Sequence, residues 1–83
     1  MKIYVDVKTP GNGKTYEFMA ESAMPVDRTK RRMIEEIIEI EDGNVTICPQ
    51  KAALYDIDAQ AALSGGGSLS DAGVRSGHSL LLL

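Results

Sequence analysis

The segment from residue 24 to residue 41 reads Met24-Pro-Val-Asp-Arg-Thr-Lys-Arg-Arg-Met-Ile-Glu-Glu-Ile-Ile-Glu-Ile-Glu41, and the rest of the chain is organised around it. Its apolar residues recur at spacings of three, four and seven, which places them on one face of a helix. They are Val26, Met33, Ile34, Ile37, Ile38 and Ile40. Pro25 suits the first turn, where its missing N–H is not needed, and Asp42-Gly43-Asn44 predicts a left-handed stop. We therefore expect one amphipathic helix, with strands and turns elsewhere.

The charges of this helix are divided between its two halves. The basic residues come first and are Arg28, Lys30, Arg31 and Arg32, followed by the acidic residues Glu35, Glu36, Glu39, Glu41 and Asp42. The helix macrodipole favours the reverse order. Pairs of Arg31 with Glu35 and of Arg32 with Glu36 would offset part of that cost, by roughly 0.2–0.5 kcal/mol each. We interpret the charges as a solvated face; the alternative is a bipolar surface that orients a partner.

Length, composition and charge limit the classes of protein. The chain has 83 residues, of which 43% are hydrophobic and 25% charged, so we expect one globular domain over residues 1–83. A net charge of −3 argues against a nucleic-acid-binding protein, which needs a basic surface.

The cysteine content and the first residues bear on the compartment. Cys48 is the single cysteine, which excludes an internal disulfide and fits a reducing environment; we expect it to be a small packing residue. Residues 1–8 carry charges where a signal peptide needs an apolar run, and no stretch reaches the roughly 20 apolar residues of a membrane span. The sequence therefore predicts a cytoplasmic protein without membrane insertion.

Two alternating segments precede the helix, in residues 1–8 and 15–20. Their expected inward residues are Met1, Ile3, Val5 and Val7 in the first and Tyr16, Phe18 and Ala20 in the second. Alternation of this kind is typical of half-buried strands. Residues 9–14, which include Pro10, Gly11 and Gly13, favour a turn, so the two strands should form a hairpin.

The pattern weakens after Gly43. Residues 45–48 are expected to be extended, Pro49 disfavours a helix, and residues 52–57 predict a third strand with Leu54, Tyr55 and Ile57 at its centre. Residues 58–63 fit either a short edge strand or an irregular turn. Residues 64–68 resemble a linker in composition but must form an internal loop, after which Leu69 should point inward and residues 79–83 should form the last strand.

Two local motifs resemble ligand sites but lack essential residues. The stretch 11–15 resembles a phosphate-binding loop, but the first glycine position falls on Lys8 and a strand follows, so we interpret it as a hairpin turn. Asp56-Ile57-Asp58 resembles the start of a calcium loop, but it lacks the glycine and the closing glutamate of that motif.

His78 is the single histidine and has no partner at a telling spacing, so we expect a solvated turn residue. We therefore predict no catalytic residue, no metal ligand and no cofactor, and a protein that is not an enzyme.

The order strand, strand, helix and two or three short strands is that of an α+β β-grasp, and the residues carry a specific likeness. Residues 1–5 resemble the opening strand of ubiquitin, and residues 68–83 resemble its closing turn and strand without a gap. The stretch Leu69-Ser-Asp-Ala-Gly-Val-Arg-Ser-Gly77 before the leucines resembles still more the small bacterial proteins of the YukD and EsaB type, as does the Pro25-Val26 helix entry. Those proteins accompany type VII (WXG100) secretion systems.

The resemblance implies a cytoplasmic accessory protein that binds a component of a type VII machine. Modifiers and sulfur carriers of this fold act through a Gly-Gly tail, whereas this sequence stops at Leu83; conjugation and sulfur transfer therefore drop out if Leu83 is the native end. Two alternatives remain, an N-terminal ubiquitin-like domain of a larger type VII membrane component and a sulfur carrier that has lost its tail.

We expect a mixed sheet of four to five strands in which the last strand lies parallel to the first. Leu80 and Leu82 should then join Ile3, Val5, Met33 and Ile37 in the core. The face away from the helix should carry an apolar patch that binds a protein or a second copy of the chain. We assign to this patch Tyr4, Tyr55, Leu81 and Leu83, with Lys2 and Asp6 at its rim.

Overall fold

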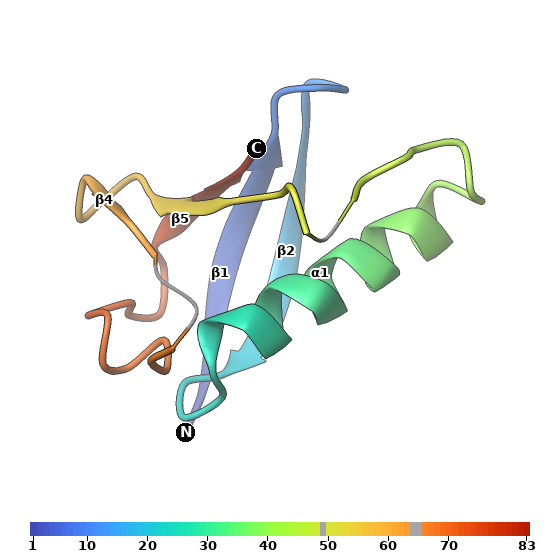
Figure 1. Cartoon of the computed structure of the whole chain (residues 1–83). Helices are drawn as coiled ribbons and strands as arrows, with labels where there is room; N and C mark the ends of the chain where they lie inside the picture. The colour runs from blue at the N-terminus through green and yellow to red at the C-terminus, as the bar shows by residue number, and fades with distance from the viewer. Residues whose placement is uncertain (49, 64–65) are drawn as a thin grey trace.

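The computed structural model describes residues 1–48, 50–63 and 66–83. Its elements are β1 (Lys2–Thr9), β2 (Lys14–Glu21), α1 (Val26–Ile40), β3 (Leu54–Asp56), β4 (Ala61–Ala62) and β5 (Ser79–Leu82). The strands form one sheet in the order β2-β1-β5-β3-β4, and α1 lies across one face of it (Figure 1). The predicted α+β fold, a mixed sheet packed on one helix, is confirmed. The sheet has five strands because the short β4 adds an edge strand. Pro49 and the first two residues of the predicted loop, Ser64 and Gly65, lie outside the described residues.

The hairpin of β1 and β2 is antiparallel and runs from the Lys2–Glu21 pair to the Thr9–Lys14 pair. Its turn is closed by the Thr9 carbonyl, which accepts the N–H groups of Asn12 and Gly13, and Gly13 takes the positive φ that favours glycine. The expected inward residues of both strands are buried, with one exception. Met1 is 87% exposed because it precedes the first paired residue of β1.

The last strand lies in the middle of the sheet. β5 pairs in parallel with β1, as the sequence predicts, and antiparallel with β3. Leu80 and Leu82 are buried on the helix side, together with Leu54. The third strand is shorter than the sequence predicts, because the chain turns after Asp56 and leaves Ile57 on the surface.

The helix begins directly after Pro25 and ends before Asp42 and Gly43, which both have positive φ. Gly43 N–H donates to the Ile38 carbonyl at 2.9 Å, so the predicted left-handed stop is confirmed. Val26, Met33, Ile34 and Ile37 are buried as expected and Ile38 is half-buried. The predicted inward position of Ile40 is wrong. Ile40 is 61% exposed on the last turn of α1, which extends past β2 (Figure 1).

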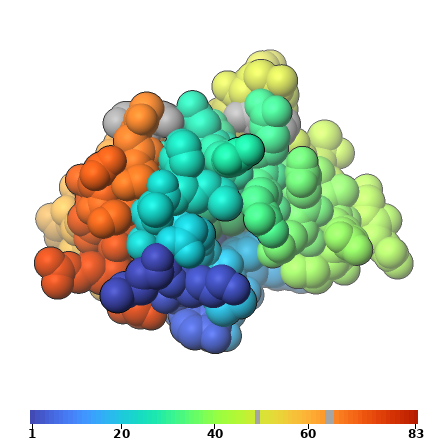
Figure 2. Space-filling view, turned by 90° about the horizontal axis from the view of Figure 1, so that it is seen from below, coloured from blue at the N-terminus to red at the C-terminus, as the bar shows by residue number. Residues whose placement is uncertain are grey.

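Residues 66–78 pack beside the turn that joins β2 to α1 (Figure 2). The Gly67 carbonyl accepts Val26 N–H at 2.8 Å, and Ser70 N–H donates to the Ser22 carbonyl at 2.8 Å. Leu69 is fully buried there, which confirms its predicted inward position. These bonds fix the helix start to the segment that leads into β5.

The segment before β3 has no regular secondary structure among its described residues. Val45 and Ile47 are half-buried against the core, so their alternation points Cys48 outward. Cys48 is therefore an exposed thiol rather than the packing residue that we expected.

Candidate protein-binding surface

The strand register determines which side chains share the face of the sheet opposite α1. One row crosses all five strands and consists of Ala62, Tyr55, Leu81, Lys8 and Thr15. Residues opposite one another in neighbouring strands project to the same side, so Tyr55, Leu81 and Lys8 are adjacent on this outer face. The register thus confirms that Tyr55 and Leu81 lie together.

Leu83 extends the same apolar region. Its backbone pairs with Ala53 through two hydrogen bonds, of 2.9 Å and 3.1 Å, which continues the β3–β5 ladder by one further pair. Leu83 therefore points to the same side as Leu81, and it is 63% exposed. Tyr55 and Leu81, which lie directly opposite each other in β3 and β5, are both half-buried. We call Tyr55, Leu81 and Leu83 the β5 cluster.

Tyr4 belongs to a separate region of the outer face. It lies opposite Met19 in the hairpin, and both side chains are 54% exposed. Lys8, not Tyr4, is the β1 neighbour of Leu81, and Tyr4 lies four positions before Lys8 along the strand, a distance of about 13 Å. The expected single patch is thus divided into the β5 cluster and a Tyr4–Met19 pair.

The row between these two regions is polar. Asp6 lies opposite Ser79 on one side and Glu17 on the other. Asp6 therefore separates the two apolar regions instead of lining a common rim, and Lys2 lies beyond Tyr4 at the far end of β1. Met19 and Lys8 were not predicted as members of this face, although the alternation of the hairpin places both on its outer side.

The start of β1 is held by the segment before β5. Tyr4 N–H donates to Ser76 Oγ at 3.1 Å, and Gly77 N–H donates to the Tyr4 carbonyl at 2.7 Å. Gly77 has a φ of +92°, a conformation that is unfavourable for residues other than glycine. Both polar groups of the Tyr4 backbone are therefore bonded to the segment before β5.

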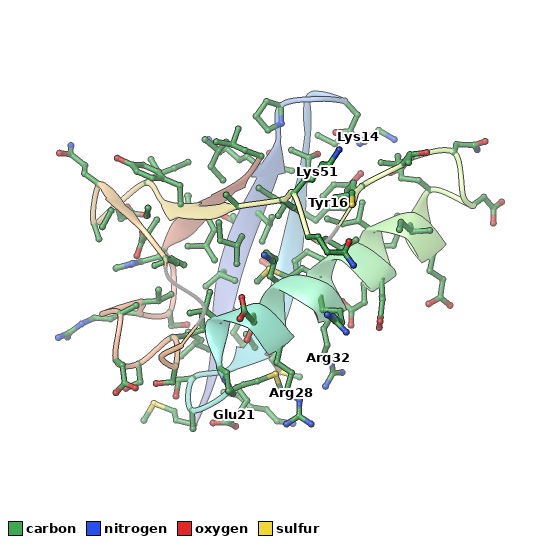
Figure 3. The ribbon with its side chains drawn as sticks, in the orientation of Figure 1. Lys14, Tyr16, Glu21, Arg28, Arg32 and Lys51 are labelled. Carbon is green, nitrogen blue, oxygen red and sulfur yellow. The ribbon has the colours of Figure 1, made fainter. Side chains whose placement is uncertain are left out.

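The opposite end of the hairpin carries a polar contact with the helix. Lys14 Nζ lies 2.7 Å from Glu41 Oε1, and the Tyr16 hydroxyl donates to Glu41 Oε2 at 2.8 Å. Lys14 and Tyr16 both lie at the start of β2 (Figure 3). The hydrogen bond from Lys14, and then that from Tyr16, holds the pKa of Glu41 below its ordinary value. The same bond raises the pKa of Lys14.

The charged side of the helix forms fewer contacts than the sequence predicts. Arg31 with Glu35 and Arg32 with Glu36 do not approach within 4 Å; in the described part of the chain the helix and its cap make one ion pair, that of Glu41 with Lys14. Lys30 instead donates to the Ala52 carbonyl at 2.9 Å. Arg28 and Arg32 lie one turn apart on the helix (Figure 3).

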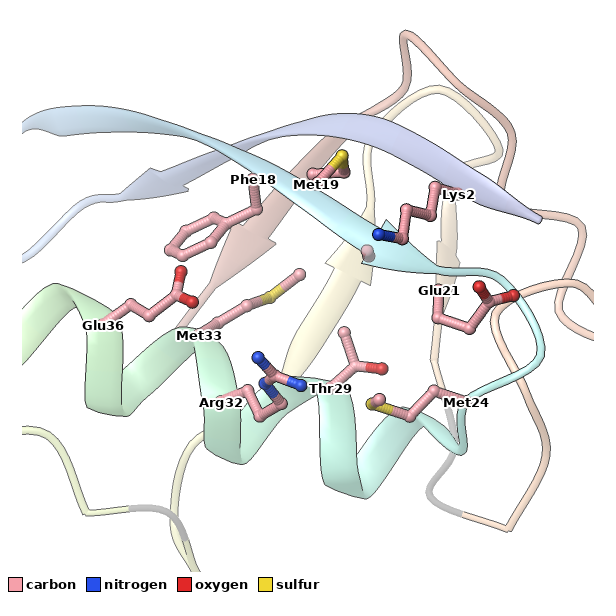
Figure 4. A pocket seen from close by; sticks show the side chains of 10 residues that line it. Lys2, Phe18, Met19, Glu21, Met24, Thr29, Arg32, Met33 and Glu36 are labelled. Carbon is pink, nitrogen blue, oxygen red and sulfur yellow. The ribbon is translucent and has the colours of Figure 1, made fainter.

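A groove of about 180 Å³ lies between β2 and α1. Phe18 and Met33 point into it from the strand and the helix, with Arg32 and Glu36 on the helix side (Figure 4). Pockets for small organic ligands usually hold roughly 300–1,000 Å³. The groove between β2 and α1 is therefore smaller than a usual ligand pocket.

Solved structures of two ubiquitin-like domains are similar to this chain. No family model matches the sequence, and no curated protein matches it. The structure of the UBL domain of Plasmodium falciparum Dsk2 is similar over 99% of this chain and 96% of that one, with a TM-score of 0.77 and 24% identity. The N-terminal ubiquitin-like domain of the 4931431F19Rik protein matches 99% of this chain and 73% of its own, with a TM-score of 0.77 and 21% identity.

The chain has the ubiquitin-like β-grasp fold. Within this fold, the β5 cluster and the Tyr4–Met19 pair lie on the face of the sheet opposite α1, and the face toward α1 forms the core. Among the described residues, no helix has the length and apolar content needed to cross a membrane.

His78 differs from the expectation. Its side chain is 21% exposed, and its Nδ1 lies 2.9 Å from Asp56 Oδ2, so it is not a solvated turn residue. The two residues are 22 positions apart in sequence. The pairing of β3 with β5 brings them together, and no local spacing in the sequence could have shown it.

Proposed function

We propose that this chain is a non-enzymatic protein-binding module that docks its partner on the β5 cluster. The observation that carries the proposal is the gathering of Tyr55, Leu81 and Leu83 on one sheet face, beside the exposed Lys8. Tyrosine is enriched among the residues that contribute most to binding, because it buries a large area with little loss of conformational freedom. A neighbouring lysine supplies the polar border of such a site.

The partner that we propose is a component of a bacterial type VII secretion machine, with the chain acting as a cytoplasmic accessory protein. The support is the resemblance of residues 69–77 and of the Pro25-Val26 helix entry to the YukD and EsaB type. The ubiquitin-like fold is compatible with this role and equally with others. The partner assignment therefore depends on the sequence resemblance.

Three other roles make different predictions. An N-terminal domain of a larger type VII membrane component requires a reading frame that continues past Leu83. A sulfur carrier would be supported by a mass consistent with a thiocarboxylate or by a downstream glycine pair. A homodimer through the β5 cluster requires a protein whose mass in solution doubles with concentration.

The test is retrieval of partners from native bacterial lysate by the immobilised chain, followed by mass spectrometry. We expect type VII components in the retrieved set, and we expect Leu81→Ser to lose them. Tyr4→Ser tests the second apolar region separately, and its loss should be smaller because Tyr4 lies outside the β5 cluster. Retrieval of the same proteins at wild-type yield by Leu81→Ser would place the docking site elsewhere.

A further inference from the structure

Three potential metal ligands converge at the edge of the sheet that carries β3 and β4. Asp56 ends β3, Asp58 lies in the turn before β4, and His78 directly precedes β5. The pairing of Asp56 with Leu80 brings these segments side by side. One ligand atom from each residue lies within 4.8 Å of the other two.

The burial of Asp56 distinguishes this cluster from an exposed acidic patch. Its side chain is 0% exposed and lies on the helix side of the sheet, in the row of Leu80 and Val7. A buried carboxylate is costly unless a cation or hydrogen bonds compensate it. Throughout the described ranges, the only basic group within 4 Å of Asp56 is the His78 ring, while Asp58 adds a second negative charge nearby.

Both carboxylates are held in place by backbone groups and retain free lone pairs. Ala59 N–H donates to Asp56 Oδ1 at 3.2 Å, and Ser79 N–H donates to Asp58 Oδ2 at 2.5 Å. A carboxylate offers about four acceptor positions, so one backbone bond to each, together with the His78 contact of Asp56, leaves lone pairs for a metal. The ligands are thus oriented by groups that a bound ion would not displace.

We propose that Asp56, Asp58 and His78 form a site for a divalent transition-metal ion of the zinc type. An imidazole nitrogen with two carboxylates suits such an ion, whereas calcium takes six to eight oxygens. Tetrahedral coordination at about 2.0–2.1 Å separates two ligand atoms by roughly 3.3 Å, so His78 Nδ1 and Asp56 Oδ2 need to part by only about 0.4 Å from 2.9 Å. The fourth position is left to water or to a group from a partner.

The test is a Zn²⁺ titration of the folded chain followed by the NMR signals of the His78 ring, which are unique because the chain has one histidine. The titration uses Cys48→Ser, because the exposed thiol is a competing zinc ligand. We expect the ring signals to shift and to saturate at one equivalent, and the unfolding midpoint temperature to rise because the ion binds only the folded chain.

Asp58→Asn removes one ligand charge but keeps an oxygen to accept Ser79 N–H, so its fold should survive. It should lose most of the ring shift and of the thermal stabilisation. Asp71→Asn is the matched control, because Asp71 accepts Ser68 N–H in another turn, and it should behave as the wild type. Unshifted ring signals in excess Zn²⁺, or equal binding by Asp58→Asn and Asp71→Asn, would overturn the proposal.

Discussion

Leu80 and Leu81 are consecutive residues of one type with opposite environments. Leu80 is 0% exposed between Val7 and Asp56 on the helix side, whereas Leu81 is half-buried between Lys8 and Tyr55 on the outer face. The same alternation buries Leu82 and leaves Leu83 63% exposed. The comparison shows that strand position, rather than residue type, assigns two of the four leucines to the core and two to a surface.

The largest expected effect is that of Leu80→Ala. Truncation of a fully buried leucine costs about 2–5 kcal/mol, and we expect the upper half of that range because β5 lies between two strands and cannot easily collapse onto the cavity. The matched change, Leu81→Ala, should cost about 1 kcal/mol or less. Denaturant unfolding of both variants measures the difference directly. Equal midpoints for the two would contradict the register of β5.

The second contrast uses two methionines. Met33 of α1 is 2% exposed and Met19 of β2 is 54% exposed. Met33→Ala should cost about 2–3 kcal/mol, because methionine is flexible and its neighbours partly fill the space, and Met19→Ala about 0.5 kcal/mol or less. Thermal unfolding of the two variants checks the order. A larger loss of stability for Met19→Ala than for Met33→Ala would contradict the assignment of Met33 to the core and Met19 to the surface.

The smallest expected effect concerns pH and the polar end of the hairpin. The folded pKa of Glu41 lies below its ordinary value of 4.5, so the unfolded chain binds the proton more readily. The stabilisation from the Lys14–Glu41–Tyr16 contact should be complete above pH 4.5 and should be lost as the pH falls through the lower folded pKa. Glu41→Gln should flatten this loss in unfolding midpoints, whereas Glu39→Gln, an exposed glutamate of α1, should not. Identical pH profiles for wild type and Glu41→Gln would exclude this contact as a source of stability.

The elements with strong periodicity were predictable from the sequence. The hairpin, the helix and the inward direction of Leu80 and Leu82 follow from alternation and from helical spacing, and the structure confirms them. The prediction that Ile40 is buried was wrong, because helical periodicity does not show where the sheet beneath the helix ends. The packing role predicted for Cys48 was wrong, because the alternation with Val45 and Ile47 places Cys48 on the outward side of its segment.

The arrangement of the outer face could be predicted only in part. Alternation placed Tyr4, Tyr55 and Leu81 on one side, but the offset between β1 and β5 sets the distance of Tyr4 from Leu81, and it depends on the loops before β5. The contact of Asp56 with His78 likewise depends on pairing between distant strands. Sequence patterns report local periodicity and carry little information on such pairings.

The β5 cluster is proposed to bind a partner without being needed for folding. The direct measurement compares the double variant Leu81→Ser, Leu83→Ser with Glu35→Ser, an exposed change on α1, in one preparation each. Unfolding midpoint and yield of retrieved partner are measured on the same samples. We predict that the double variant stays folded and loses the partner, while Glu35→Ser keeps both. Retention of the partner at wild-type yield by the folded double variant would contradict the claim.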